Sequence, residues 1–194
     1  MKIYLIDFNE AIIRAWKKYF KNETDVFIEY SHLHYFLDEH PNLQAIVSPA
    51  NSFGIMTGGY DGAITRYFGE DLQKDVQKHI IDNFFGEQVV GTSCSVKIPN
   101  TDKYLIHTPT MRVPEKIQDS RIIYHCMRST LIEAHRLNVD SVLIPAFGGL
   151  TGGINPDELA WHMYNAYKQI QHHVVNQPKE LSFRTVYRCE PNWW

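Results

Sequence analysis

Two polar side chains in a glycine-rich stretch are the best placed in this sequence to do chemistry. Asn51 and Asp61 lie in the run PANSFGIMTGGYD, which we call the first glycine loop (residues 49–61). Glycines let a ligand approach the backbone, and the N–H groups and dipole of a helix start favour phosphate. An aspartate that faces such a ligand could activate a water molecule. The stretch therefore predicts an anion-binding loop with an acid beside it.

Each of these residues also has a purely structural explanation. Asp61 falls where the next helix is expected to start, and aspartate is a favoured N-cap, whose carboxylate would be ionised and turned into the helix. Asn51 could close its own turn through its side-chain oxygen. Spacing does not separate these explanations from a functional site, and both remain open at this point.

A second glycine-rich run, FGGLTGGI, occupies residues 147–154 and is called the second glycine loop. It follows a buried apolar run and precedes a clear helix start, in which Asn155 is the expected N-cap and Pro156 the first helical residue. Neither loop matches GxxxxGK[ST] or GxGxxG. Two such loops, each between a buried strand and a helix, together favour phosphate or nucleotide binding.

Hydrophobic periodicity supplies the elements that position these loops. Strands are expected at 3–8, 25–30, 45–47, 91–98, 104–107 and 141–146, helices at 10–20, about 62–85, 119–137 and 155–172, a short helix or turn at 31–38, and a last strand at 182–189. The 91–98 and 104–107 strands could form an antiparallel hairpin. The alternation predicts one α/β domain over residues 1–194, with a mainly parallel sheet covered on both faces. Both glycine loops would then lie at the carboxyl edge of the sheet, where such folds bind ligands.

Composition excludes several classes of function. A net charge of −3 gives no overall basic field, which makes nucleic acid an improbable partner. No apolar run approaches the ~20 residues of a membrane span, and the N-terminal run is too short for a signal peptide. Three cysteines, Cys94, Cys126 and Cys189, favour a reducing compartment over a disulfide framework. We therefore expect a soluble cytoplasmic protein whose oligomeric state the sequence does not specify.

The remaining candidate residues have mainly structural interpretations. His107, His125 and Cys126 show no HxxxH or CxxC spacing, so neither a metal nor a cofactor is expected. Cys94 has no identifiable base and reads as a buried inert thiol. Tyr60 and Phe147 flank the glycine loops, where their rings could stack on a ribose or base or could equally pack in the core. Trp193 and Trp194 are expected on the surface or against a partner.

Taken together, these motifs resemble the macrodomain family of ADP-ribose-binding modules and ADP-ribosyl hydrolases. Residues 45–52 and 58–64 (AIVSPANS and GGYDGAI) resemble the family's DAIVNAAN…GGG(V/I)DGAI signature. Residues 144–153 (IPAFGGLTGG) are similar to its (F)PALGTGVGG loop, and residues 108–112 (TPTMR) look like a bacterial and phage-associated branch. The resemblance covers about residues 45–170.

The resemblance implies a three-layer α/β/α sandwich with a mixed, mainly parallel sheet of six or seven strands. Asn51 would position the distal ribose, and Asp61 would orient or activate a water at its anomeric carbon. The implied partner is ADP-ribose or an ADP-ribosylated protein, bound without a metal. Its implied contacts are Ala50, Gly58, Gly59, Tyr60, Phe147, Gly148, Gly149, Leu150, Thr151, Gly152, Gly153 and Ile154.

Three features depart from the family pattern. Ser31 stands near the place of the aspartate that recognises adenine, and Asp7 does not match that place. Met56 and Thr57 are bulky where many hydrolases have glycine, and Phe147 replaces a smaller apolar residue. The leading hypothesis is hydrolysis of mono-ADP-ribosylated protein or ADP-ribose 1''-phosphate. The alternatives are an ADP-ribose reader without turnover and a module that binds another nucleotide or an RNA end.

Overall fold

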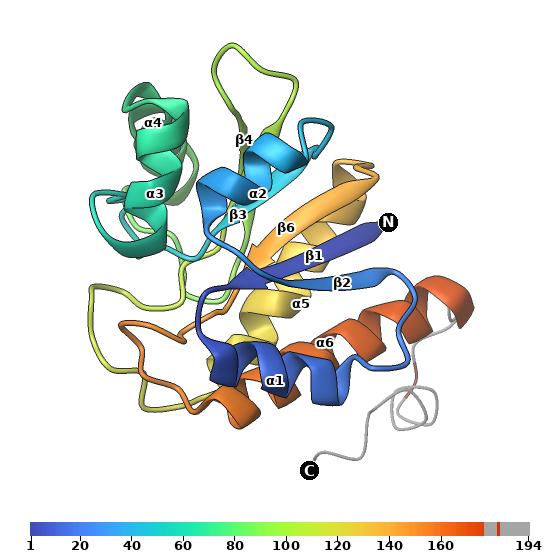
Figure 1. Cartoon of the computed structure of the whole chain (residues 1–194). Helices are drawn as coiled ribbons and strands as arrows, with labels where there is room; N and C mark the ends of the chain where they lie inside the picture. The colour runs from blue at the N-terminus through green and yellow to red at the C-terminus, as the bar shows by residue number, and fades with distance from the viewer. Residues whose placement is uncertain (177–181, 183–194) are drawn as a thin grey trace.

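Six strands form one mixed sheet in the computed structural model, which describes residues 1–176 and 182. The strands are β1 (Lys2–Asp7), β2 (Val26–Tyr30), β3 (Ala45–Ser48), β4 (Cys94–Lys97), β5 (Tyr104–His107) and β6 (Ser141–Pro145), and their spatial order is β2-β1-β6-β3-β5-β4. Neighbouring strands are parallel except β4, which runs antiparallel to β5. The predicted hairpin is therefore confirmed, and β6 lies at the centre of the sheet between β1 and β3 (Figure 1).

Helices cover both faces of the sheet, so the expected three-layer sandwich is confirmed (Figure 1). One layer contains α1 (Glu10–Tyr19), α5 (Arg121–Arg136) and α6 (Pro156–Asn176), and the other contains α2 (Leu33–Glu39), α3 (Gly59–Phe68) and α4 (Asp71–Phe84). Side chains of a strand point alternately to the two faces. In β6, Val142 and Ile144 accordingly join the core under α1, α5 and α6, and Leu143 joins the core under α2, α3 and α4.

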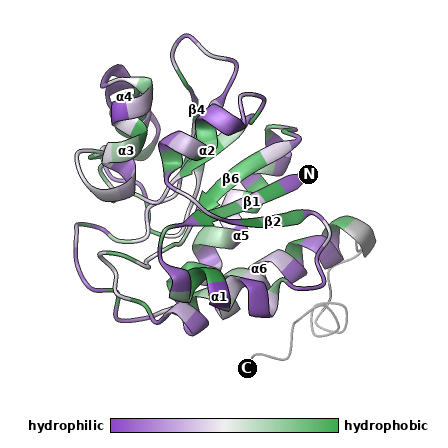
Figure 2. Cartoon of the chain, in the orientation of Figure 1, coloured by the Kyte–Doolittle hydropathy of each residue, from purple (hydrophilic) through white to green (hydrophobic). Residues whose placement is uncertain are grey.

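The hydropathy of the chain follows this layering. The strands are largely hydrophobic, whereas the helices carry hydrophilic residues along their length (Figure 2). The central strands β3 and β6 are buried on both faces, as their continuous apolar runs predict. The predicted N-cap of α6 is also present, because Asn155 Oδ1 accepts a hydrogen bond of 2.9 Å from the Asp157 N–H.

The prediction of one long helix between residues 62 and 85 is wrong, because the structure has two helices there, α3 and α4. Gly69 ends α3 with φ = 96°, a conformation that only glycine adopts readily. The apolar residues Ile64, Leu72, Val76 and Ile80 nevertheless line one core, so their spacing hid the break. At the end of α4, Phe85 and Gly86 both have positive φ, and the Gly86 N–H donates to the Ile80 carbonyl oxygen.

Three other expectations differ in extent or fall on residues that the structure does not describe. The segment expected as a short helix or turn at 31–38 forms most of α2, which ends one residue later, and α6 continues to Asn176 rather than ending near residue 172. The expected last strand, with Cys189, Trp193 and Trp194, lies outside the described residues apart from Ser182. Within the described part of the chain, none of the helices has the length and apolar character that crossing a membrane requires.

Candidate functional site

The two glycine loops meet at the carboxyl edge of the sheet. The first follows β3 and leads into α3, and the second follows β6 and leads into α6. The two strands are hydrogen-bonded neighbours, with Ala45 opposite Val142 and Ile46 opposite Leu143. A Cβ atom added to Gly59 would lie 3.6 Å from Leu150 Cδ2, so the loops are within van der Waals reach of each other. The predicted side-by-side placement of the loops is confirmed.

Asp61 lies in the first turn of α3 without capping that helix. The N-cap is Gly58, and no side chain makes a capping hydrogen bond there. One Asp61 carboxyl oxygen instead accepts a hydrogen bond of 2.6 Å from Ser48 Oγ, at the end of β3. Burial raises the pKa of Asp61 to about 7, against the opposing effect of the Ser48 hydrogen bond. The capping explanation is therefore excluded, and Asp61 is a carboxyl group that can change protonation state near neutral pH.

Tyr60 adds a buried hydroxyl group beside this carboxyl. Its Oη atom is buried and has no hydrogen-bond partner among the described residues. Burial raises the pKa of Tyr60 well above 10, and the nearby carboxylates of Asp61 and Asp7 raise it further. The ring packs against the core under α2, α3 and α4. Tyr60 is thus a neutral hydrogen-bond donor close to Asp61, and its ring serves the core rather than a stacking surface.

Asn51 uses its side-chain amide to hold the first glycine loop together. Its Oδ1 accepts hydrogen bonds from the N–H groups of Phe53 (3.2 Å) and Ile55 (3.3 Å), and its Nδ2 donates to the Ile55 carbonyl oxygen (2.8 Å). The turn-closing explanation is therefore the one that the structure shows. The neighbouring Ala50 is buried, and its carbonyl oxygen accepts from the Thr110 N–H (3.2 Å).

A row of available N–H groups lines the second glycine loop. Gly148 and Gly153 have φ of 71° and 68°, and the Ile154 N–H closes the loop on the Gly148 carbonyl oxygen (3.1 Å). The N–H groups of Leu150, Thr151, Gly152 and Gly153 have no protein acceptor within the described residues. Successive backbone N–H groups in a turn form a concavity suited to an anion. The loop therefore has the backbone geometry of a phosphate site.

The ring of Phe147 is not available to a ligand at the second glycine loop. Its side chain is fully buried in the core formed with α1, α5 and α6, so core packing, not stacking, is the outcome for this candidate. Ile154 is partly buried against the same core, whereas Leu150 is exposed. Contacts of the second loop with a ligand would therefore come from its backbone and from Leu150 and Thr151.

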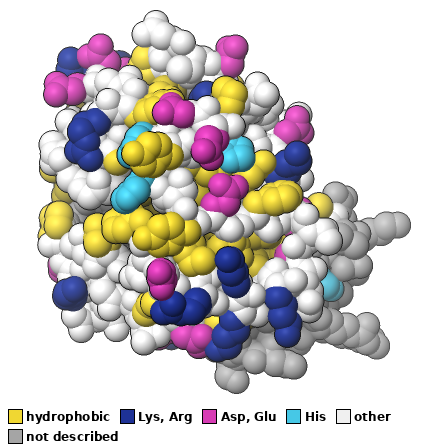
Figure 3. Space-filling model, in the orientation of Figure 1, with side chains coloured by type: hydrophobic (Ala, Val, Ile, Leu, Met, Phe, Trp, Pro, Cys, Tyr) yellow, Lys and Arg dark blue, Asp and Glu magenta, His cyan; other side chains and the backbone are white. Residues whose placement is uncertain are grey.

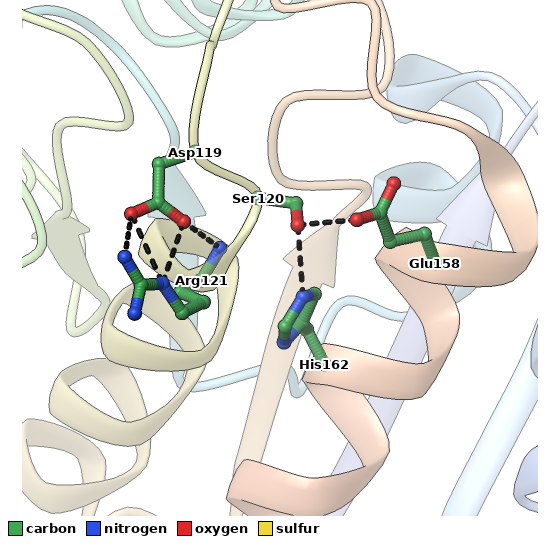
Figure 4. A network of polar contacts seen from close by, with 5 residues as sticks. All are labelled: Asp119, Ser120, Arg121, Glu158 and His162. Carbon is green, nitrogen blue, oxygen red and sulfur yellow. Dashed lines mark hydrogen bonds and ion pairs between the residues drawn. The ribbon is translucent and has the colours of Figure 1, made fainter. Parts of the chain in front are cut away.

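Polar contacts fix the segment of residues 115–120, and Figure 4 shows those of Ser120 with α6. The Ile117 N–H donates to the Gly152 carbonyl oxygen (3.0 Å). Ser120, just before α5, donates from Oγ to Glu158 (2.5 Å) and lies 3.0 Å from His162 Nε2, both in α6. The sequence gives no local signal for this network, because 38 residues separate Ser120 from Glu158.

A buried side chain, Gln88, supports the first glycine loop from beneath. The backbone N–H of Gln88 donates to the Ser52 carbonyl oxygen (2.9 Å), and its side-chain Oε1 lies 2.7 Å from His107 Nδ1 and accepts from Cys94 Sγ (3.2 Å). Burial lowers the pKa of His107 to about 4 and raises that of Cys94 to about 12. Cys94 is thus the inert thiol that was expected, and His107 is a neutral structural residue.

Potential metal ligands come together at a different place in the fold. In the described part of the chain, one group of three such side chains lies within reach of a single ion, namely Glu29 of β2, Glu39 of α2 and His40 directly after α2. It includes none of His107, His125 and Cys126. His40 Nε2 lies 3.6 Å from a Glu29 carboxylate oxygen, so these two side chains form an ion pair when His40 is protonated.

Aromatic rings lie near Ser31, the residue close to the place where the family resemblance would put an aspartate that recognises adenine. Ser31 Oγ donates to the His32 carbonyl oxygen, and the Ser31 N–H donates to the Asp7 carbonyl oxygen. The exposed ring of Phe8 stacks on His32, with 5.0 Å between centroids. Hydrophobic and histidine side chains are grouped on this face of the molecule (Figure 3). Asp7, the last residue of β1, lies beside Ser31, and burial raises the pKa of its carboxyl group.

Comparisons with known proteins find relatives in sequence and in fold. An uncharacterized protein of Aeropyrum pernix is 30% identical over 117 residues, and one of Aquifex aeolicus is 34% identical over 116 residues. These alignments cover 60% and 59% of this chain, and the chain spans 59% and 66% of the two relatives.

Solved structures with the same fold include several macrodomains. The Oceanobacillus iheyensis macrodomain with MES bound has a TM-score of 0.58 at 22% identity, covering 66% of this chain and 69% of that chain. A point mutant of it with ADPR has a TM-score of 0.56 at 21% identity (64% and 69%). The macrodomain of Mycobacterium tuberculosis DarG has a TM-score of 0.57 at 22% identity (66% and 83%). The family model described as Macro domain matches residues 47–163, more than half of the 194 residues, and the chain therefore belongs to the Macro domain family.

Proposed function

We propose that this protein binds ADP-ribose between its two glycine loops and hydrolyses a bond at the distal ribose. The observation that carries the proposal is the environment of Asp61. Its carboxyl is held by Ser48 at the carboxyl edge of the sheet, and its pKa of about 7 lets it act as a general base at neutral pH. The substrate would be mono-ADP-ribosylated protein or ADP-ribose 1''-phosphate.

Different groups would bind the substrate and transfer the proton. The available N–H groups of residues 150–153 would hold the diphosphate, which needs no metal because the backbone dipoles oppose its charge. Ionised Asp61 would take a proton from a water molecule as the water oxygen bonds to the anomeric carbon. The bond from that carbon to the leaving carboxylate or phosphate oxygen breaks, and its electron pair leaves with the oxygen.

Binding and turnover are tested separately. Calorimetric titration with ADP-ribose should give micromolar affinity, and an assay for ADP-ribose release from modified protein or from ADP-ribose 1''-phosphate should then show turnover. Absence of binding at millimolar ADP-ribose would contradict the proposal as a whole. Binding without turnover of either substrate would reject only the hydrolytic part.

Binding without turnover is the second candidate function, and Asn51 favours it. A residue that positions a ribose should present its amide to the ligand, yet the Asn51 amide is engaged by the backbone of its own loop. A titration that is as tight for Asp61→Asn as for the wild type, with no release of ADP-ribose by either, would select this candidate.

A different nucleotide or an RNA end is the remaining alternative. Its support is Ser31, whose hydroxyl is used locally and which supplies no acid for adenine. A competition panel of ADP-ribose, AMP, ATP and short RNA identifies the preferred ligand. Preference for ADP-ribose would remove this alternative.

A further inference from the structure

Lys116 lies across the second glycine loop. A Cβ atom added to Gly153 would lie 2.7 Å from Lys116 Nζ, 3.1 Å from Cδ and 3.4 Å from Cε. The lysine side chain therefore covers the α-carbon of Gly153, at the end of the row of available N–H groups at residues 150–153. Such a close approach requires glycine, which has no Cβ atom to displace the lysine.

The backbone that follows Lys116 is fixed at two points. The next residue, Ile117, donates its N–H to the Gly152 carbonyl oxygen, and its Cδ1 atom fills the space beside Gly148 and Gly152. Three residues further on, Ser120 is held by Glu158 and His162 at the start of α6 (Figure 4). These contacts make the position of the lysine beside the loop a property of the fold.

Among the described residues, no side chain neutralises the charge of Lys116. Lys116 has no ion-pair or side-chain hydrogen-bond acceptor within the described residues, whereas Lys18, Lys74, Lys78 and Lys168 each have a carboxylate partner. The two acids in the first turn of α6 are engaged elsewhere. Asp157 pairs with Lys18 and Tyr19, and Glu158 accepts from Ser120. A positive charge therefore stands at the edge of a loop built to receive an anion.

We propose that Lys116 is a phosphate-binding residue that selects ligands with a diphosphate at the second glycine loop. The backbone N–H groups supply fixed partial charges, and the lysine adds one full charge on a flexible stem that can follow the ligand. The expected ligand class is a pyrophosphate ester. That this ester is ADP-ribose rests on the proposed function, whereas the role of Lys116 towards a pyrophosphate does not.

The test compares Lys116→Gln with wild-type protein and with Lys21→Gln. Lys21 is an exposed lysine beyond the end of α1, at the opposite edge of the sheet, so its substitution removes the same charge away from the loops. Affinities are measured by calorimetry for ADP-ribose and for inorganic pyrophosphate. A charge-assisted contact predicts that Lys116→Gln weakens both ligands about five- to tenfold, while Lys21→Gln does not. Lys116→Arg should retain most of the affinity, since it keeps the charge.

The outcomes separate the two proposals. Equal affinity of wild type and Lys116→Gln for both ligands would overturn the role of Lys116 and leave ADP-ribose binding intact. Binding of pyrophosphate but not ADP-ribose, with loss in Lys116→Gln, would support Lys116 and overturn the proposed function. Binding of neither ligand by the wild type would overturn both. A loss as large in Lys21→Gln would show a general charge effect and also reject the proposal.

Discussion

At the scale of single residues, Asp61 carries the sharpest prediction. General base catalysis typically contributes about 10²–10⁴-fold, so Asp61→Asn should lower the rate of ADP-ribose release by at least about 100-fold. The substitution keeps the size of the side chain and a hydrogen-bond acceptor for Ser48, so the affinity for ADP-ribose should change little. Single-turnover assays alongside calorimetry separate the two effects. Wild-type rates in Asp61→Asn would remove its role as a base.

The hydrogen bond from Ser48 gives a second prediction at this scale. The base must be ionised to accept a proton, so the rate should rise with pH through about 7 and then level off. The Ser48 hydrogen bond lowers the pKa of Asp61, and its removal in Ser48→Ala should therefore shift the rising limb to higher pH. The pH–rate profiles of the two proteins test this directly. An unchanged profile in Ser48→Ala would show that Asp61 is not the titrating group.

The sequence locates the candidate residues better than it defines their roles. Asp61 and the glycine loops stand out because residue type and local spacing identify them. Ser48 and Lys116 do not, because their relation to the loops depends on strand pairing and on the path of residues 115–120. The fate of Asn51 was likewise open, since an amide that closes a turn and one that faces a ligand have the same sequence signature.

At the scale of elements, the glycine loops depend on close backbone contacts that a methyl group would disrupt. In Gly152→Ala, the new Cβ would lie 2.6 Å from Ile117 Cδ1 and 2.8 Å from the Gly148 carbonyl oxygen. Overpacking of this kind typically costs about 1–3 kcal/mol, so the free energy of unfolding should fall by that amount. Denaturant titration measures it.

Gly58→Ala is the matched control for that substitution. A Cβ at Gly58 would meet no atom within 4 Å, and its φ of −135° suits alanine, so this variant has no overpacking cost and should lose only the preference of an N-cap for glycine over alanine, at most about 1 kcal/mol. Equal losses in the two variants would contradict the packing argument.

Element boundaries show where periodicity succeeds and where it does not. β5 coincides with its expected residues, and α1 ends one residue before its expected end. The division between α3 and α4 was missed because an apolar residue every fourth position continues across Gly69. The backbone at Gly69 has a positive φ there, and this conformation leaves no trace in the hydrophobic pattern.

At the scale of the whole molecule, two buried groups shift stability with pH in opposite directions. Asp61 has a pKa of about 7 in the folded protein against an ordinary 3.8, so the folded state binds more protons between these values. Stability from this group therefore falls as the pH rises. His107 has a folded pKa of about 4 against an ordinary 6.5, so the unfolded state binds more protons and stability rises with pH.

A variant without the ionisable Asp61 carboxyl should show more clearly the pH dependence of stability that His107 contributes. In Asp61→Asn, the free energy of unfolding should rise more steeply with pH between about 4 and about 6.5 than in the wild type, by at most about 1.4 kcal/mol per pH unit. Denaturant titrations across this range provide the comparison. Parallel curves for the two proteins would show that Asp61 ionises normally in the folded state.

The central place of β6 determines how the sheet can assemble. β2 and β1 form one part of the sheet, β3, β5 and β4 form another, and β6 pairs with both. Residues of β1 pair with residues about 140 positions later in the chain, and such distant contacts are slow to form. During synthesis, most of the chain must therefore be made before β6 can pair with the second edge of β1. The second glycine loop directly follows β6, so the ligand site would form only in the last stage of folding.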